Sequence, residues 1–240
     1  QTPRARWSGG FYFYIKLNTI TTGGTVKKSK QASDNFIREY KNQFPNNFCD
    51  KLINILEENL KIGRTHKGVL GKNKLNAHKK DSFDLDLIPD VGIEGVDRQL
   101  YLGFDSYLFG PITDYANSYV INSQGKTDYM TEDDVRQAFV LLQPPKLKKY
   151  KAPDQGYHAW HQDYGIQPVQ ARRIFVAMVY LNDVSEGGET AFYHQNIEIK
   201  PQRGKMVIFP PYFTHIHRGN RPISNDKYIC NFYLGINPDI

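Results

Sequence analysis

The stretch YHAWHQDYG, residues 157–165, places a histidine and an aspartate two positions apart, His161 and Asp163. In an extended strand, residues two apart point to the same face, so both side chains can reach one metal ion. A histidine and a carboxylate are two of the three protein ligands in sites that hold Fe(II) on one face and leave coordination positions open for substrates. The pair alone is weak evidence, because an ion pair at the end of a strand gives the same pattern.

Such a site needs a second histidine from a distant part of the chain. The segment FPPYFTHIHRGNRP offers His215 and His217, and Lys227 opens the apolar segment KYICNFYLGI ten residues after His217. Strand alternation would place Lys227 on one face with Ile229, Asn231 and Tyr233. A lysine that faces the interior of a barrel is costly unless an anion pairs with it. A carboxylate of a cosubstrate is such an anion.

The elements that must position these residues change character along the chain. Apolar spacing predicts helices over 47–61, over much of 104–121, and from Thr131 to before Pro144. Asn46 or Asn47 is the expected cap of the first helix, and Asp134 forms a weak capping box with Thr131.

Short apolar strands follow these helices. The pattern predicts strands over 173–181, 205–209 and 227–236, with a turn at 185–188. Residues 1–31 are expected to form an edge strand and a flexible arm, and residues 63–100 a long polar loop. Helices first and strands later indicate an α+β fold with an all-β core at the C-terminal end.

Bulk composition narrows the class of protein. The 240 residues are 40% hydrophobic and 13% aromatic, enough to bury a core, and the net charge of +6 is too diffuse to argue for nucleic acid. No apolar run is long enough to cross a bilayer, and QTPRARWSGG lacks the apolar region of a signal peptide. Two cysteines, Cys49 and Cys230, make no disulfide framework, so we expect a cytoplasmic protein.

Four stretches resemble, in order and spacing, the prolyl 4-hydroxylase-type branch of the iron(II)/2-oxoglutarate dioxygenases: KYKAPDQGYHAWHQD, YLNDVSEGGETAFY, PQRGKMVIFP and HRGNRPISNDKY. The resemblance covers roughly residues 145–237. It implies a double-stranded β-helix core (jelly-roll, cupin-like) with N-terminal support helices. We therefore expect residues 1–144 to supply an arm, support helices and loops, and residues 145–240 the dioxygenase core of one integrated catalytic domain.

The resemblance also implies roles for single residues. His161, Asp163 and His217 match the metal ligands and form, with Lys227, the expected catalytic set. His217 is preferred to His215, because in the family a basic residue follows the distal histidine by about ten positions, as Lys227 does here. By strand parity His215 would point to the same face, so His215 stays the alternative ligand.

Three residues are expected to bind the cosubstrate. Lys227 matches the residue that pairs with the distal carboxylate of 2-oxoglutarate. Tyr150 stands where a tyrosine donates a hydrogen bond to that carboxylate, with an ordinary core tyrosine as the alternative. Thr190, in GGET, lies where relatives have a strand that borders the cosubstrate pocket, and a turn residue is the alternative.

The sequence departs from the family pattern at two positions, and two basic segments have open interpretations. Tyr233 stands where many relatives have tryptophan, and an extra residue before His161 is expected to shift Tyr157 away from a cosubstrate role.

We interpret KKYK (148–151) as a solvated face, with steering of an anionic cosubstrate as the alternative. The basic segment 64–80 is interpreted as a solvated loop, or as a lid over a peptide substrate.

The implied cofactor is Fe(II), with 2-oxoglutarate and molecular oxygen as cosubstrates and ascorbate as an optional addition. The expected reaction is hydroxylation of a C–H bond, with a peptidyl proline as the first candidate target. A non-proline residue or a small molecule is the alternative target. A third hypothesis is a binding module without turnover, and the intact triad and Lys227 argue against it. We expect a peptide or protein substrate, no nucleic acid and no membrane, and the oligomeric state stays open.

Overall fold

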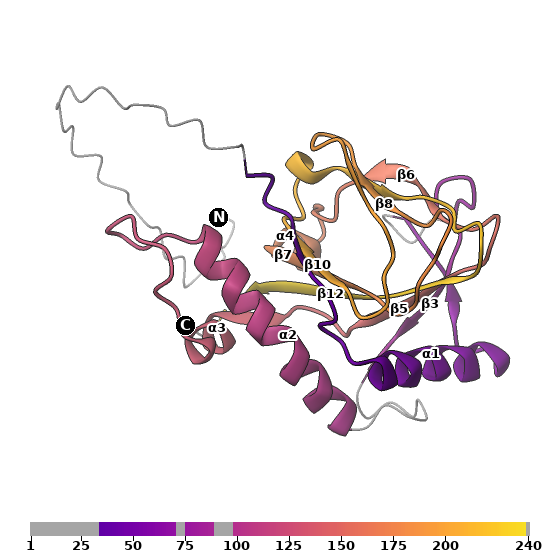
Figure 1. The fold of residues 1–240 in the computed structure, drawn as a ribbon, viewed down its shortest axis with the longest axis horizontal. Coiled ribbons are helices and arrows are strands. Elements are labelled where there is room, and N and C mark those ends of the chain that lie inside the picture. Colours follow the sequence, from indigo (N-terminus) through magenta and orange to yellow (C-terminus); the bar gives the residue numbers. More distant parts are fainter. Residues whose placement is uncertain (1–33, 71–74, 89–97, 239–240) are drawn as a thin grey trace, which may run out of the picture. The chain divides into compact units, whose positions relative to one another are not determined.

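Two antiparallel sheets face each other in the computed structural model, which describes residues 34–70, 75–88 and 98–238 (Figure 1). The larger sheet has the strand order β1-β10-β7-β12-β5-β3-β2, and β4 pairs with the far end of β12. Its strands are β1 (Arg38–Tyr40), β2 (His66–Lys67), β3 (Phe83–Asp86), β4 (Phe139–Leu141), β5 (Lys146–Tyr150), β7 (Phe175–Tyr180), β10 (Met206–Phe209) and β12 (Lys227–Ile236).

The smaller sheet has four strands in the order β6-β11-β8-β9. These strands are β6 (Tyr157–His161), β8 (Thr190–Phe192), β9 (Ile197–Ile199) and β11 (His217–Gly219). They alternate along the chain with strands of the larger sheet, as in a jelly-roll. Both sheets are needed for the site, because His161 and His217 lie on the smaller one and Lys227 on the larger one.

The central strands of the larger sheet are buried on both faces, which explains their continuous apolar runs. On β7, Phe175, Ala177 and Val179 join a core beneath the helices, whereas Val176, Met178 and Tyr180 join a core between the sheets. The second core also contains Phe192 and Ile199 of the smaller sheet. The alternation of one strand thus holds three layers together: helices, larger sheet and smaller sheet.

Helices cover the outer face of the larger sheet, as Figure 1 shows for α1 (Asn46–Lys61) and α2 (Arg98–Tyr119). With α3 (Glu132–Ala138), they contribute Leu52, Leu56, Leu108, Ile112 and Val135 to the core on that side. Short helical turns, α4 (Pro168–Ala171) and the 3-10 turn η2 (Phe213–His215), lie between the strands. The predicted α+β jelly-roll fold with support helices is confirmed.

Two details of the helix prediction have different outcomes. The capping box of α3 is confirmed, because the Thr131 side chain accepts from the Asp134 N–H and the Asp134 carboxylate accepts from the Thr131 N–H. The predicted asparagine cap of α1 is wrong. Pro45 is the cap residue, since its carbonyl already accepts from the N–H groups of Phe48 and Cys49, and Asn46 and Asn47 lie inside the helix.

The prediction of a long loop over residues 63–100 is wrong for β2, β3 and the start of α2. The polar residues that suggested a loop are partly buried and paired: Asp84 of β3 is 1% exposed and accepts hydrogen bonds from Lys80 and Ser82. The KKYK segment is not the expected solvated face, because Lys148 and Lys149 lie buried in β5. Lys149 pairs with Glu57 of α1, and Lys148 lies opposite Asp84 of β3 in the sheet, which sequence spacing could not show.

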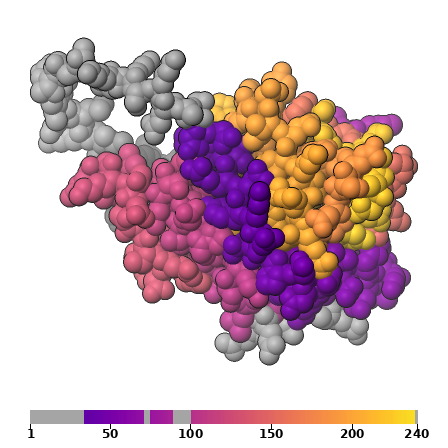
Figure 2. All heavy atoms as spheres, viewed as in Figure 1, coloured from indigo at the N-terminus to yellow at the C-terminus, as the bar shows by residue number. Residues whose placement is uncertain are grey.

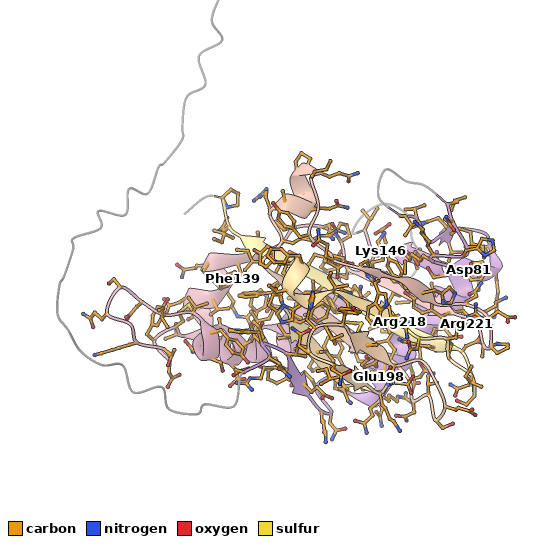
Figure 3. All side chains as sticks on the ribbon, turned by 90° about the horizontal axis from the view of Figure 1, so that it is seen from above. Asp81, Phe139, Lys146, Glu198, Arg218 and Arg221 are labelled. Carbon is orange, nitrogen blue, oxygen red and sulfur yellow. The ribbon has the colours of Figure 1, made fainter. Side chains whose placement is uncertain are left out.

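Chain segments far apart in sequence share the larger sheet. The surface view shows the indigo residues that carry β1 and α1 running between the magenta helical region and the orange strands (Figure 2). Phe139, at the start of β4, and Arg221, after β11, lie at opposite ends of the sheets (Figure 3). The division of the chain at residue 145 stays a prediction, and strands on both sides of it pair in this sheet.

Three further expectations concern the N-terminal segment, the cysteines and the membrane. The expected edge strand and arm over residues 1–31 lie outside the described residues. Both cysteines, Cys49 and Cys230, are free and buried. Within the described ranges, no helix is both long and apolar enough to pass through a membrane.

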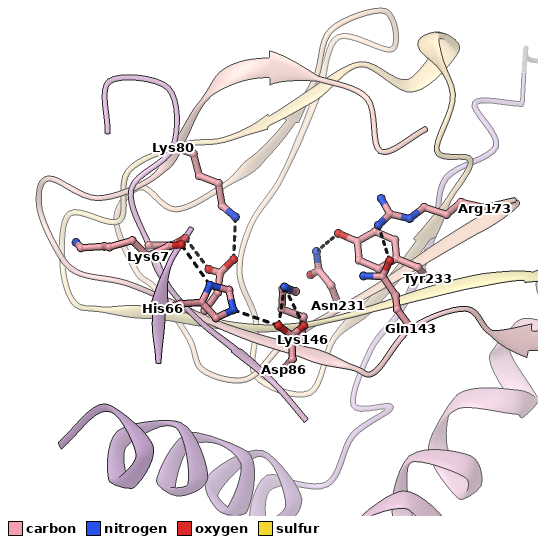
Figure 4. A network of polar contacts seen from close by, with 11 residues as sticks. His66, Lys67, Lys80, Asp86, Gln143, Lys146, Arg173, Asn231 and Tyr233 are labelled. Atoms are coloured by element: carbon pink, nitrogen blue, oxygen red, sulfur yellow. Dashed lines mark hydrogen bonds and ion pairs between the residues drawn. The ribbon is translucent and has the colours of Figure 1, made fainter. Parts of the chain in front are cut away.

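A charged cluster joins the edge strands. Asp86 of β3 accepts from Lys146 of β5 at 2.8 Å and contacts His66 of β2 at 3.1 Å (Figure 4). Burial opposes ionisation of Asp86, but the hydrogen bonds from His66 and Lys146 hold its pKa at about 2. The hydrogen bond to Asp86 raises the pKa of His66.

We expect Asp86→Asn to destabilise the fold most between about pH 4 and pH 6, by about 1 kcal/mol because the cluster is partly exposed. The carboxylate of Asp86 stabilises the fold above its unfolded pKa of about 3.9, and this contribution disappears as the pH falls toward its folded pKa. The charged His66 contributes below its unfolded pKa of about 6.5, and this contribution is lost as the pH rises through its folded value. Urea unfolding at pH 5 and pH 8 measures the difference. Asp154→Asn, at an exposed turn, is the control, and an Asp86→Asn effect that does not change between the two pH values would contradict the assignment.

Candidate active site

Three side chains at one end of the β6–β11 strand pair form a candidate metal site. His161 ends β6, Asp163 follows it in the next turn, and His217 begins β11 directly opposite His161. One ligand atom from each residue lies within 4.8 Å of the others, and the His217 Nε2 to Asp163 Oδ2 distance is 3.5 Å. No other group of this kind is found among the described residues.

Backbone carbonyls fix the tautomer of both imidazoles. His161 Nδ1 lies 3.0 Å from the Ala159 carbonyl, and His217 Nδ1 lies 3.0 Å from the His215 carbonyl. A carbonyl only accepts, so each Nδ1 carries the proton and each Nε2 presents a lone pair. In many proteins, a metal-binding histidine is oriented in this way, by a hydrogen bond from the ring nitrogen that does not bind the metal.

The charges of the site favour a cation. Burial, followed by the nearby His217, lowers the pKa of His161 to about 3, so the ring is neutral at pH 7. Burial opposes ionisation of Asp163, but His217, His161 and Arg173 hold the pKa of its carboxyl below the usual value. Two imidazoles that each present Nε2 and one carboxylate are the donor set that Fe(II) takes in open oxygenase sites, so these residues fit that metal.

His215, the alternative ligand, lies elsewhere. It is in the 3-10 turn η2 rather than in a strand, so the strand-parity argument does not apply to it. Its Nε2 lies 2.9 Å from the Asn35 carbonyl and its Nδ1 lies 2.9 Å from Thr214 Oγ1. Both ring nitrogens of His215 are therefore occupied, and the ring is 4% exposed.

Lys227 enters the space between the sheets from the first position of β12. It is 2% exposed, and its Nζ donates to the Gly188 carbonyl at 2.6 Å. Burial lowers the pKa of Lys227 to about 7, with Glu189 opposing and Lys148 adding to the shift. The lysine and the triad line the same cavity. An ammonium with one hydrogen bond and no carboxylate partner fits the expected anionic cosubstrate.

The two other predicted cosubstrate residues line this cavity as well. Tyr150 lies opposite Lys227 in the β5–β12 register, is 4% exposed, and has no hydrogen bond from its hydroxyl among the described residues. Thr190 begins β8 and is hydrogen-bonded to the Tyr180 hydroxyl at 2.7 Å. The structure therefore leaves the Tyr150 hydroxyl available for a ligand and engages the Thr190 hydroxyl.

Sequence reasoning did not identify three further residues of the site. Tyr157, which the extra residue was expected to displace, stacks on His161 with ring centroids 3.5 Å apart and lines the cavity. Lys148, assigned to a solvated face, lines the cavity too. Arg173 donates to the Asp163 carbonyl at 2.7 Å and covers the Tyr233 ring at 3.7 Å. The parity of β5 could have indicated Lys148, because it lies two residues from Tyr150.

A wider cleft of about 730 Å³ opens beside the triad. Tyr157, Asp163 and Lys148 line both the cavity and the cleft, so the two spaces adjoin at the triad. Arg173, Gln143 and Tyr233 lie along one side of the cleft, and Tyr233 is hydrogen-bonded to Asn231 of the inner cavity (Figure 4). Val69, Leu70 and the segment 164–170 form other parts of its lining. The basic segment 64–80, for which a lid was the alternative interpretation, thus contributes to the cleft, and its residues 71–74 lie outside the described residues.

Comparison with known proteins gives a family for this part of the chain. Residues 145–235 match the family model described as the 2OG-Fe(II) oxygenase superfamily. The comparison with curated proteins gives no match.

Solved structures with a similar fold include three prolyl hydroxylases. The viral collagen prolyl hydroxylase of Paramecium Bursaria Chlorella virus-1, in its 2OG complex, is 19% identical, with 83% of this chain and 95% of that chain covered and a TM-score of 0.54. A prolyl hydroxylase from Trichoplax adhaerens, in complex with a hypoxia inducible factor peptide fragment, is 14% identical, with 84% of each chain covered and a TM-score of 0.61. A Pseudomonas putida prolyl-4-hydroxylase is 14% identical, with 82% and 91% covered and a TM-score of 0.52.

Residues 145–235 thus match the 2OG-Fe(II) oxygenase superfamily, and the chain has the fold of the prolyl hydroxylases. The resemblance found in the four sequence motifs is confirmed. So is the predicted class, a 2-oxoglutarate-dependent dioxygenase with Fe(II) as its cofactor and 2-oxoglutarate and dioxygen as cosubstrates. The part of ascorbate stays a prediction.

We expect His161→Ala, Asp163→Ala and His217→Ala each to weaken divalent metal binding by more than about 100-fold. Loss of a residue that only hydrogen-bonds a metal ligand already lowers metal affinity by about 10- to 100-fold, and loss of the ligand itself lowers it further. His215→Ala should lower stability, since its ring is buried and bonded, but leave metal affinity near that of the unaltered protein. Titration with Mn(II) or Co(II) measures the affinity, and thermal unfolding measures the stability. His194→Ala, at an exposed position, is the matched control. Normal metal binding by His217→Ala together with its loss in His215→Ala would reverse the assignment.

Proposed function

We propose that the chain hydroxylates a peptidyl proline, with His161, Asp163 and His217 as iron ligands and Lys227 as the anchor of 2-oxoglutarate. The observation that carries this proposal is the common cavity: the triad and the buried ammonium line one space between the sheets. The cleft beside the triad supports a substrate larger than an amino acid. The fold shared with prolyl hydroxylases, one of them bound to a peptide, supports a peptide that contains proline.

The chain's own residues position the reactants. Lys227 binds the distal carboxylate of 2-oxoglutarate, and the unengaged hydroxyl of Tyr150 donates a second hydrogen bond to it. Tyr157 holds the His161 ring by stacking on it, and Arg173 holds the Asp163 turn through its carbonyl. Fe(II) bound to the triad, with 2-oxoglutarate and dioxygen, supplies the oxidising power that hydroxylates a C–H bond while 2-oxoglutarate is converted to succinate and CO2.

The alternative is the same oxygenase chemistry on a non-proline residue or a small molecule. A shared fold does not fix the substrate, because loops around the cleft select it. The cytoplasmic location inferred from the cysteines stays a prediction as well.

Measurements of succinate release and of product mass distinguish a peptidyl proline from a non-proline or small-molecule target. We expect a proline-rich peptide to gain one oxygen per succinate formed, and the same peptide with every proline changed to alanine to gain none. Free proline and other amino acids form the small-molecule arm. Oxygen incorporation into the alanine peptide or into a free amino acid, without any into the proline peptide, would contradict the proline assignment while leaving the oxygenase class intact.

We expect Lys227→Ala to weaken 2-oxoglutarate binding by about 30-fold or more, since loss of one partner of a buried charge pair costs about 2–5 kcal/mol. Tyr150→Phe should weaken it less, because one neutral donor is lost. Titration of the cosubstrate into the anaerobic Fe(II) or Mn(II) protein measures both. Metal affinity should stay unchanged, and Lys126→Ala, in an exposed loop, is the control. Unchanged 2-oxoglutarate affinity in Lys227→Ala would place the anchor elsewhere.

The pH dependence of cosubstrate binding should report the same lysine. The groups whose charges act on Lys227 are Glu189 and Lys148, and the neutral rings of Tyr150 and Tyr180 lie over it. With its pKa at about 7, Lys227 is charged in the free protein below that pH and loses its proton above it. An anion binds the charged form, so 2-oxoglutarate affinity should fall by about tenfold per pH unit above pH 7. In Lys227→Ala the slope should vanish, and a slope that persists in this variant would assign it to another group.

A further inference from the structure

A second buried lysine of the active site has no assigned role. Lys148, at the centre of β5, is 5% exposed. Within the described ranges of the chain, its Nζ makes no hydrogen bond and no ion pair. Its neighbour in the same wall, Lys227, donates to a carbonyl, so Lys148 is the less satisfied of the two ammonium groups.

The other cations around the cleft have partners. Lys80 Nζ donates to Asp84 Oδ2 at 2.8 Å, and Lys146 Nζ lies 2.8 Å from Asp86 Oδ1. Arg173 donates to the Asp163 carbonyl and to Gln143 Oε1. Figure 4 shows the contacts of Lys146 with Asp86 and of Arg173 with Gln143.

The acid nearest to Lys148 along the sheet is already engaged. Asp84 lies opposite Lys148 in the β3–β5 register, so the two side chains share a face. Its Oδ2 accepts from Lys80 and its Oδ1 accepts from Ser82 at 2.6 Å. Asp84 therefore hydrogen-bonds to Lys80 and Ser82 and acts on Lys148 through its charge alone, without a hydrogen bond or an ion pair between the two.

A buried ammonium without a partner is costly to the fold. Burial lowers the pKa of Lys148, with Asp84 and Asp163 opposing the shift. A residue that stabilised the fold would be bonded, as Lys80 and Lys149 are. An anion that arrives with a ligand would satisfy Lys148, as 2-oxoglutarate is proposed to satisfy Lys227.

The position of Lys148 indicates which ligand brings that anion. Lys227 lines only the inner cavity, whereas Lys148 lines both that cavity and the cleft beyond it. Asp163, a proposed iron ligand, is at the same junction. A group bound to Lys148 therefore lies beside the reacting centre, on the side from which a substrate enters.

We propose that Lys148 binds a carboxylate of the substrate, so that the preferred peptide carries an aspartate or glutamate close to the hydroxylated residue. The proposal rests on the proposed function, in that it takes a peptide as the substrate, but it does not require the target to be proline. It makes Lys148 a specificity-determining residue of the cleft.

Four matched peptides separate the two proposals. The target is proline or alanine, and the three positions on each side of it carry either glutamate or glutamine. Binding is measured by fluorescence anisotropy to the anaerobic protein loaded with Mn(II) and 2-oxoglutarate, so no turnover is required. We expect the glutamate peptides to bind at least about 30-fold more tightly than the glutamine peptides, whichever residue is the target.

Variants assign the preference to Lys148. Lys148→Met should abolish the preference for glutamate, and Lys148→Arg should keep part of it, since the charge remains but the compact ammonium becomes a planar fork. Lys126→Met, in an exposed loop, should behave like the unaltered protein. Because Lys148→Met removes an unpaired buried charge, it should also unfold about 2–4 °C higher, which shows that the lost preference is not due to misfolding.

Three results would overturn the proposal. They are equal binding of glutamate and glutamine peptides, no binding of any of the four, and a loss of 2-oxoglutarate affinity in Lys148→Met as large as the loss of peptide affinity. The last result would assign the carboxylate to the cosubstrate instead. A glutamate preference without hydroxylation of the proline peptides would support the role of Lys148 and reject the proline target.

Discussion

The antiparallel pairing of β6 with β11 is the interaction on which the whole site depends. It sets His217 directly opposite His161, although 56 positions separate them in the chain. Backbone hydrogen bonds of the sheet fix the distance between the two imidazoles, and carbonyls of the same segments fix their tautomers. A shift of one residue in this register would turn His217 to the opposite face of the sheet, so that its imidazole could no longer meet His161 and Asp163.

The second constraint is charge in a space of low polarity. Lys227 and Lys148 reach into the region between the sheets, where a lone ammonium is unfavourable and an ionised carboxylate of a ligand is a strong partner. The two lysines lie on adjacent strands, β12 and β5, but differ in access, since only Lys148 also faces the cleft. In our proposals, the same physical cost thus provides one anchor for the cosubstrate and one selector for the substrate.

The rest of the molecule keeps this arrangement rigid. The larger sheet packs its even-numbered β7 residues toward the smaller sheet and its odd-numbered ones toward the helices, so any movement of the site wall disturbs two cores. Charges that do not serve the site are paired at the edges, as Asp86 is with Lys146 and His66. Lys148, a buried cation with no ion pair among the described residues, is at the site, which agrees with the general tendency of functional sites to be less stable than their surroundings.

How far the sequence alone could determine the protein depends on whether a signal is local. The spacing of His161 and Asp163, the continuous apolar runs of β7 and β12, and the capping box of Thr131 are local patterns, and each predicted its element. The order of four motifs was enough to indicate the family. Alternation within KYICNFYLGI even placed Lys227 on the inner face with Ile229 and Tyr233.

Tertiary structure decided what depends on partners from distant segments. His215 and His217 are equivalent by strand parity. The spacing to Lys227 favoured His217, and the structure separates the two by the 3-10 turn around His215. A basic run such as KKYK is typical of a solvated face, and only the pairing of β5 between β3 and β12 buries Lys148 in the active site. The polar segment before residue 88 resembled a loop, because the lysine and serine that satisfy Asp84 become its partners only when the chain folds around them. The physical reason is the same in each case: the free energy of burying a charge is set by the neighbours it meets, and the sequence of one segment does not contain them.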